Sequence, residues 1–125
     1  MSDFVVVSRD YPRLAQLLVE QAPSFEGSPE FRGLGPSDLE IPSVVCGAFR
    51  RFVEHAHLQG PQEEATEAAR AMEWMASNSD PEIENYLIVD VFEHLELEGS
   101  ALDAFLARLL PASRALYERW IEPST

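Results

Sequence analysis

The side chains best suited to metal or acid–base chemistry are three histidines and the carboxylates near them in the sequence: His55, His57 and His94, with Glu54, Asp90 and Glu93. Asp90 and His94 are four residues apart, a spacing that places both on one helix face and can hold an ion or a proton-relay pair. One interpretation is a metal-binding or hydrolytic module in which Asp90, Glu93 and His94 act with His55 or His57. The other, which we favour because no complete zinc motif is present, is a half-buried histidine paired with Asp90 as ordinary structure.

The single cysteine and the glycine-rich segments do not form a catalytic motif. Cys46 lies in an apolar run without a base near it in the sequence, which is typical of a buried, unreactive thiol. No Gly-x-Ser-x-Gly motif, P-loop or dinucleotide fingerprint occurs, and the glycines at positions 33 and 35 are typical of a turn. The sequence therefore favours a protein without catalysis and without a cofactor.

Charge is the strongest feature of the composition. There are 22 acidic residues against 9 basic ones, all arginine, and the net charge at pH 7 is −13. Residues 62–103 hold twelve acids and only Arg70, net −11, whereas residues 1–61 are net −3 and residues 104–125 net +1. Such a surface repels nucleic acid and anionic membranes and attracts a basic protein. The alternative is an acidic surface that serves only solubility.

Length and hydropathy favour one cytoplasmic domain. A chain of 125 residues can bury a single core, so we expect one helical domain over residues 1–125. No stretch approaches the ~18 apolar residues of a membrane span, and the first ten residues lack the features of a secretory signal peptide. A lone cysteine cannot form an internal disulfide and suits a reducing compartment.

The elements that position these residues are predicted to be helices packed around residues 80–99. Asp80 is a candidate helix cap with Pro81 in the first turn, and Gly99 supplies a left-handed stop. Between them an apolar side chain recurs every four positions, at Ile83, Leu87, Val91 and Leu95. The pattern predicts a central helix.

Around this helix the sequence predicts an all-α fold of five to six helices with an N-terminal extended arm at residues 4–7. Earlier helices are predicted over residues 10–23, 42–58 and 61–76. Ser100 and Asp103 predict a capping box for a fifth helix, and Pro111 ends it and begins a sixth. Residues 23–41, rich in glycine and proline, predict a long loop of the kind that is often functional. Apolar residues are expected to pin this loop to the core: Phe25, Phe31, Leu34, Leu39 and Ile41.

An internal repeat is a further prediction. A shift of 39 residues superposes Pro42 on Pro81, Gly60 on Gly99, and the Glu-His pair at 54–55 on the pair at 93–94. A period near ~40 is typical of stacked helical hairpins of the HEAT or armadillo type. Residues 42–77 and 81–110 would then be duplicated hairpins. The alternative is that any two helical hairpins share proline starts and glycine stops.

A partner-binding surface is predicted where aromatic residues lie among carboxylates on the third and central helices. Glu63, Glu64 and Glu67 are expected to face water, opposite an inward face of alanines and methionines. Tryptophan is one of the side chains that most often anchor interfaces, although Trp74 can equally cap the core. The predicted contact residues are Glu63, Glu64, Glu67, Trp74, Asn85, Glu93 and Glu96.

The segment NYLIVDVFEHLE, residues 85–96, follows a two-helix unit and the polar turn Asn78-Ser79-Asp80. It resembles the signature helix of a family of small acidic helical bacterial proteins, mostly uncharacterised, several of which are similar to immunity proteins of toxin systems. The resemblance covers about residues 42–110 and carries over no catalytic residue. It implies a cytoplasmic protein that neutralises a cognate toxin by occluding its active site.

Together these patterns favour a non-catalytic acidic immunity protein that binds and blocks a basic bacterial toxin, and that contacts neither nucleic acid nor membrane. The metal-binding or hydrolytic module described above is one alternative. A structural subunit of a homo-oligomer is another, although a net charge of −13 opposes self-association.

Overall fold

The computed structural model describes residues 13–122, and within them the chain is helical without strands. The α-helices are α1 (Leu14–Gln21), α2 (Pro23–Glu26), α3 (Pro29–Arg32), α4 (Pro42–Leu58), α5 (Gln62–Ala76), α6 (Pro81–Tyr86), α7 (Gly99–Arg108) and α8 (Pro111–Trp120). A short 3₁₀ helix, η2 (Asp38–Glu40), precedes α4, and a π-helical segment, η3 (Leu87–Phe92), continues α6. The all-α prediction is confirmed, but the prediction of five to six helices is not, because residues 13–122 form eight α-helices. The predicted arm at residues 4–7 lies outside the described residues.

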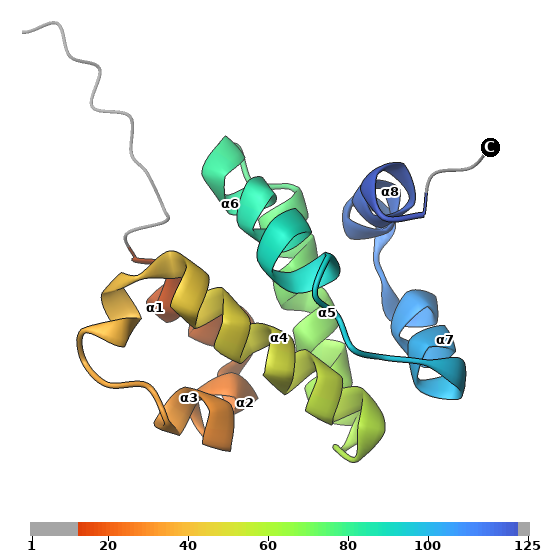
Figure 1. Ribbon diagram of the computed structural model, residues 1–125. Helices are drawn as coiled ribbons and strands as arrows, with labels where there is room; N and C mark the ends of the chain where they lie inside the picture. Colours follow the sequence, from red (N-terminus) through yellow and green to blue (C-terminus); the bar gives the residue numbers. More distant parts are fainter. Residues whose placement is uncertain (1–12, 123–125) are drawn as a thin grey trace, which may run out of the picture.

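Helices α4 and α5 form the centre of the described structure as a helical hairpin. Helices α1 to α3 lie on one side of this hairpin, and α7 and α8 lie on the other (Figure 1). The turn between α4 and α5 requires glycine at position 60, because an added Cβ would lie 2.8 Å from the Ala56 Cα. No helix within residues 13–122 combines the length and the apolar character that a membrane crossing needs.

The predicted boundaries and buried faces of α4 and α5 are confirmed. Helix α4 begins at Pro42 and ends at Leu58, as its proline start and glycine stop indicate. The inward face of α5 is buried as predicted: Ala65, Ala68, Ala69, Met72 and Met75. Small side chains on this face allow neighbouring helices to approach closely.

The predicted helix over residues 80–99 is wrong in its length. Asp80 caps it as expected, accepting the Glu82 N–H at 3.0 Å, but the helix ends at Phe92. Its second half is wound so that the Glu93 N–H donates to the Ile88 carbonyl five residues back, at 3.0 Å. This winding sends four side chains into the core: Leu87, Ile88, Val91 and Phe92.

Contacts from α4 explain why the helix stops. The Arg50 guanidinium donates to the His94 carbonyl at 3.2 Å, and the Glu96 N–H donates to the Glu54 carboxylate at 2.7 Å. These two backbone groups form their hydrogen bonds with side chains of α4 and not within a helix. Residues 93–98 therefore form an irregular segment, and Leu95 is not part of the helical stripe that the sequence predicts. The centre of the described structure is therefore the α4–α5 hairpin and not the helix over residues 80–99.

Two further predictions at this end of the chain are wrong. Gly99 has a φ of +58°, in the left-handed region, but it opens α7 instead of ending the preceding helix. The expected capping box of Ser100 and Asp103 does not form, because α7 begins earlier, with Glu98 at its N-cap and no side-chain capping bond. The HEAT-like pairing is not confirmed either: residues 54–55 lie inside α4, while residues 93–94 lie beyond the end of η3.

The segment 23–41 is a chain of short helices held to the core. Phe25 is fully buried, and its ring centroid lies 5.1 Å from that of Phe31 and 5.4 Å from those of Phe49 and Phe52. Leu34 and Leu39 also pack against the core. Four of the five expected pins are confirmed, whereas Ile41 is 46% exposed.

Candidate functional site

Two glutamates of α5 hold the starts of other helices. The Glu67 carboxylate accepts the Ser24 N–H at 2.8 Å and the Ser24 hydroxyl at 3.0 Å, at the start of α2. The Glu73 carboxylate accepts the N–H groups of Ala112 and Ser113, at 3.0 and 2.9 Å, at the start of α8. The first N–H groups of a helix have no partner within it and carry partial positive charge, so these carboxylates stabilise both helices.

Glu67 therefore does not face water as the helical pattern predicts. Its side chain is only 8% exposed, because α2 packs against the side of α5 that carries it. A buried carboxylate whose oxygens already accept two hydrogen bonds is not available to a partner. The Glu67 side chain therefore stabilises the fold by bonding Ser24, and it is not exposed as a contact residue would need to be.

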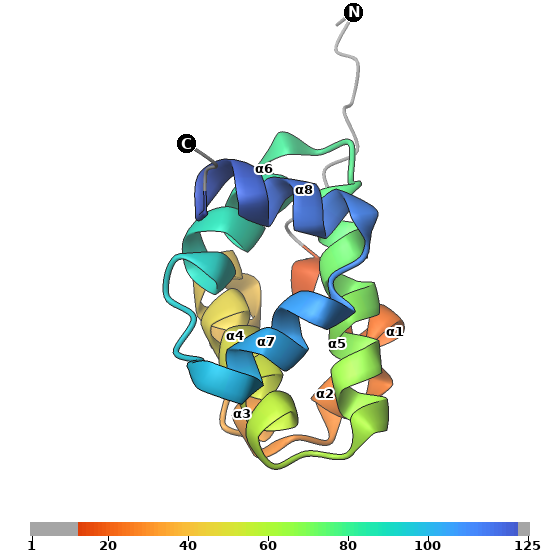
Figure 2. The ribbon, with the colours of Figure 1, turned by 90° about the vertical axis from the view of Figure 1, so that its right-hand side faces the viewer.

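Four other glutamates lie toward one end of the molecule, and a fifth, Glu93, precedes the contact of His94 with Arg50, about two turns back along α4. Glu63 and Glu64 lie in the first turn of α5, and residues 93–98 approach the last turns of α4 through the bond between Glu54 and the Glu96 N–H. Figure 2 shows the α4–α5 turn and the start of α7 at this same end. We call the acidic end the set of Glu63, Glu64, Glu93, Glu96 and Glu98.

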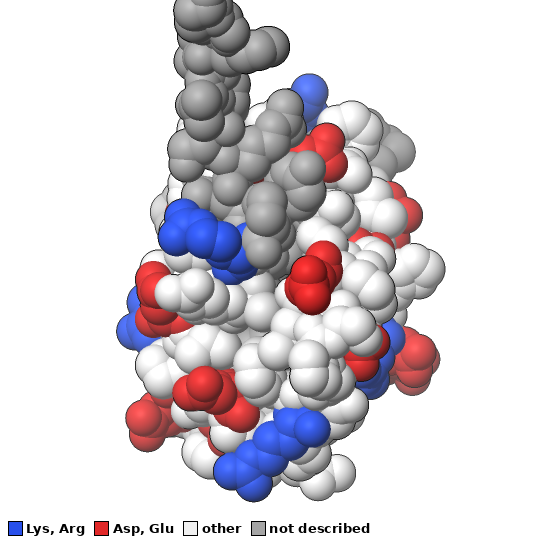
Figure 3. All heavy atoms as spheres, turned by 90° about the vertical axis from the view of Figure 1, so that its left-hand side faces the viewer, with Lys and Arg blue, Asp and Glu red and all other residues white. Residues whose placement is uncertain are grey.

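No ion pair neutralises the acidic end within the described residues. The ion pairs within residues 13–122 join Arg50 to Glu54, His55 to Glu30, and Arg114 to Glu118, and none of them includes a glutamate of the acidic end. The face that carries α1 and α3 differs, because acidic and arginine side chains are scattered over it among uncharged residues (Figure 3).

The structure divides the predicted contact residues among three environments. Glu63, Glu64, Glu93 and Glu96 share the acidic end, and Glu67 is buried. Trp74 is half-buried against the core, which agrees with its interpretation as a core cap. Asn85 is exposed on α6, which follows the carboxyl end of α5. Because a helix of 15 residues is about 22 Å long, α5 separates Asn85 from Glu63 and Glu64 in its first turn.

The histidines do not converge. The His55 ring nitrogen lies 3.5 Å from a Glu30 oxygen, His57 bonds the Val53 carbonyl at 2.9 Å, and His94 is exposed beyond η3. Within residues 13–122 no group of three or more His, Cys, Asp or Glu side chains is placed to hold a metal ion. The ligand set of the metal-binding alternative is therefore not assembled among the described residues.

Burial raises the pKa of two other groups, Cys46 and Asp90. The pKa of the Cys46 thiol is raised far above its usual range, chiefly by burial and further by the nearby negative charge of Asp90, so the thiol stays protonated. Burial also raises the pKa of Asp90, while His94 opposes this shift and Glu93 adds to it. The Cys46 thiol therefore lacks the lowered pKa that would activate it as a nucleophile.

His57 is expected to make stability depend on pH. Its Nε2 is buried without a hydrogen-bond partner, and the ring packs edge-on against Phe105 at 5.5 Å. Burial lowers its pKa below 6.5, the Val53 carbonyl opposes this shift, and Arg108 adds to it. The folded state therefore takes up the proton less readily than the unfolded state does, so stability is full above pH 6.5 and falls as the pH drops below it.

Urea unfolding at a series of pH values between about 7.5 and 5 measures this effect. The variant His57→Phe should lose part of the decline in stability below the ordinary histidine pKa. Gln59→Ala is the control, because Gln59 is exposed and carries no charge, and it should leave the decline unchanged. A His57→Phe protein with the same pH profile as the native chain would contradict the assignment.

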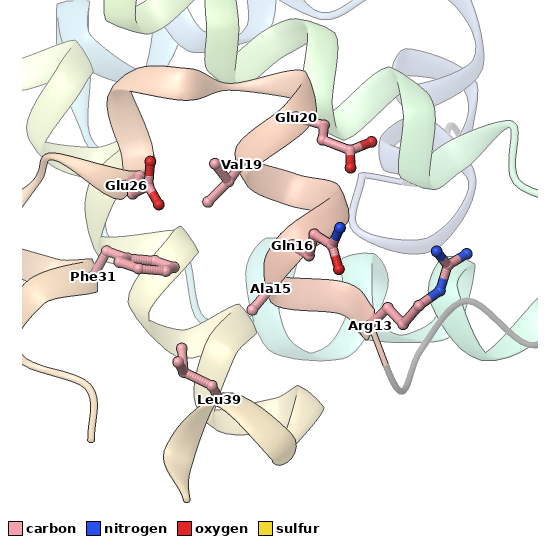
Figure 4. Close-up of a pocket in the computed structure, with 8 residues that line it drawn as sticks. All are labelled: Arg13, Ala15, Gln16, Val19, Glu20, Glu26, Phe31 and Leu39. Carbon is pink, nitrogen blue, oxygen red and sulfur yellow. The ribbon is translucent and has the colours of Figure 1, made fainter. Parts of the chain in front are cut away.

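A hollow that the sequence did not predict lies between α1, α2, α3 and η2. Its volume is about 430 Å³, and its lining consists of Arg13, Ala15, Gln16, Val19, Glu20, Glu26, Phe31 and Leu39. Val19, Glu26 and Phe31 point toward one another across it (Figure 4). Phe31 and Leu39, which the sequence predicts only as residues that pin segment 23–41 to the core, line this hollow as well.

A family model described as a domain of unknown function, DUF7674, matches residues 15–122. No curated protein and no solved structure matches the chain. Nothing in the family's description links it to immunity proteins.

Proposed function

The chain belongs to the DUF7674 family, a domain of unknown function, and from its own surface we propose that it is a non-catalytic binding protein for a basic protein partner. The observation that carries this proposal is the acidic end, where five glutamates lie without an ion pair among the described residues. A basic partner would supply the missing counter-charges and would associate quickly through electrostatic attraction.

Glu93 and Glu96 are the two glutamates of the acidic end that lie where a helix dipole does not favour negative charge. Glu63 and Glu64 lie in the first turn of α5, where the helix dipole favours negative charge without any partner. Glu93 instead follows the carboxyl end of η3, where the dipole disfavours a carboxylate, and Glu96 lies outside any helix. Their positions are therefore not explained by helix stability, and binding a basic surface would relieve the repulsion between them.

The segment that presents these two carboxylates is held in place before any partner arrives. Arg50 and Glu54 of α4 bond its backbone at His94 and Glu96, at 3.2 and 2.7 Å. A surface that is already ordered loses less conformational entropy on binding. Close charge pairs at such interfaces are worth about 1.5–7 kcal/mol in double-mutant cycles.

In its specific form the proposal is an immunity protein that inhibits a bacterial toxin. The carboxylates would occupy a basic cleft in the positions of substrate phosphates and so block it. The support for this form is the acidic charge together with the resemblance of residues 85–96 to the signature helix described above.

Charge reversal at the acidic end tests the binding function. Glu93→Arg with Glu96→Arg should abolish capture of basic proteins from a lysate of the source organism, because two attractive charges become repulsive. Both side chains are exposed, so each change should alter the free energy of unfolding by no more than about 0.5 kcal/mol. The measurements are a pull-down with identification of the captured proteins and a urea unfolding curve.

Glu20→Arg with Glu40→Arg is the matched control. It changes the net charge by the same amount, but at a different place. Both residues are exposed, Glu20 on α1 and Glu40 on η2, and η2 comes just before the start of α4, whereas the acidic end lies near the end of α4. It should capture the same proteins as the native chain. If the Glu93 and Glu96 variant retains every captured protein, the acidic end is not the binding surface.

The immunity form has its own test. Expression of the captured basic protein alone should stop bacterial growth, and co-expression of the native chain, but not of the Glu93 and Glu96 variant, should restore it. A captured partner that is harmless when expressed alone would remove the immunity form and leave the binding function standing.

A further inference from the structure

We propose that the acidic end recognises a basic segment that carries a large apolar side chain, and that this side chain packs against Leu58. The inference rests on the proposed binding function and adds the chemistry of the segment that is bound. The partner segment is an amphipathic stretch with lysine or arginine on either side of its apolar anchor.

Leu58 is the most exposed of the large apolar side chains within residues 13–122. Its exposed fraction is 59%, against 54% for Trp120, 46% for Ile41 and 41% for Leu110. It ends α4 and borders a hollow of about 650 Å³, which is lined by Leu58, Leu95, Glu96, Leu97 and Glu98. Burial of a leucine side chain is worth about 1.5–3 kcal/mol, so a partner that covers Leu58 gains affinity.

Single exposed leucines are common, and exposure alone does not mark a site. Here three leucines and two glutamates line one hollow together. An apolar centre with a polar rim is the usual anatomy of a binding interface. Because acidic residues lie beside these leucines, the matching segment needs basic residues around its apolar side chain.

The rim keeps its negative charge. Arg50 reaches this segment at the His94 carbonyl, but its guanidinium is already paired with Glu54 at 2.6 Å. Glu96 and Glu98 form no ion pair among the described residues. A second copy of the chain would bring its own charge of −13, so charge opposes self-association at this hollow.

A synthetic peptide of about 15 residues, designed as an amphipathic helix with leucines on one face and lysines elsewhere, is a suitable probe. One companion peptide has serine in place of leucine, and another has glutamine in place of lysine. Titration calorimetry with the full chain should give a Kd for the leucine–lysine peptide at least about tenfold lower than for either companion.

Three protein variants locate the contact. Leu58→Ser should raise the Kd at least about tenfold, whereas Ile41→Ser, at the exposed opposite end of α4, should leave it within about twofold. Leu58→Met should restore binding, because methionine retains a similar apolar volume. Glu96→Gln with Glu98→Gln should weaken binding and flatten its dependence on salt. Thermal melts show whether each variant is folded.

The outcomes separate this inference from the proposed function. If Leu58→Ser binds the leucine–lysine peptide as the native chain does, or if the serine peptide binds equally well, the apolar anchor is wrong. If the native chain does not bind the leucine–lysine peptide, the anchor is also wrong. In each case the binding function stands as long as reversal of Glu93 and Glu96 abolishes capture of the basic protein, and it falls if that reversal has no effect.

Discussion

Replacement of Phe92 by alanine is expected to lower the free energy of unfolding by about 3–5 kcal/mol, the range for a large aromatic removed from a core. Phe92 ends η3 and is 2% exposed. Its ring lies edge-on to Phe105 at 6.2 Å and to Tyr117 at 5.2 Å, and so it joins η3 to both α7 and α8. Alanine would leave a cavity where three elements meet.

Urea unfolding followed by circular dichroism measures the loss. Trp120→Ala is the control, because Trp120 is a larger aromatic that is 54% exposed, and its loss should be well below that of Phe92→Ala. Phe92→Leu should fall between the native chain and Phe92→Ala, since it retains part of the buried volume. A loss below about 1 kcal/mol for Phe92→Ala would contradict the packing of η3 against α7 and α8.

Replacement of Glu73 by alanine is expected to cost about 2–3 kcal/mol, the scale for buried donors that lose a charged acceptor. The N–H groups of Ala112 and Ser113 would lose their partner, and Ser113 is fully buried. Unfolding curves give the loss in free energy. Amide hydrogen exchange should show faster exchange at residues 112 and 113.

Glu63→Ala is the matched control for this change. It removes the same side chain from the same helix, but Glu63 is exposed and its carboxylate makes no hydrogen bond or ion pair with another helix among residues 13–122. Its effect should stay within about 0.5 kcal/mol. Equal losses for the two variants would mean that the carboxylate of Glu73 does not hold α8.

Local signals predicted those parts of the fold that local interactions determine. The start of α4 follows from Pro42, and its end from the turn that needs glycine at position 60. The buried face of α5 follows from the spacing of its alanines and methionines. In α4 the residues that determine where the helix begins and ends lie within a few positions of those ends. In α5 the residues that determine the buried face lie on that face.

The length of the predicted central helix could not be read from its own residues. The stripe from Ile83 to Leu95 satisfies every local criterion of a helix, yet Arg50 and Glu54 bond the backbone that would have continued it. These partners lie more than forty positions earlier in the chain. Periodicity carries no information about such distant donors and acceptors.

The same limit applies to the candidate site. The count of charges identified residues 62–103 as the acidic part of the chain, and Glu63, Glu64 and Glu96 of the predicted contact residues lie toward one end of the molecule. The sequence could not separate Glu67 from Glu63 and Glu64, because all three lie on one side of α5 by helical spacing. Only the packing of α2 shows that Glu67 is buried.

The carboxylates of Glu54, Glu67 and Glu73 each bond a segment of the chain that is synthesised at a different time from their own helix. Each bonds a segment about forty residues away, toward the C-terminus from Glu54 and Glu73 and toward the N-terminus from Glu67. The α4–α5 hairpin closes over a short turn, whereas these bonds close long loops, which form more slowly. Helix α2 is synthesised before α5, yet it acquires the acceptor for its first N–H groups only after α5 has left the ribosome.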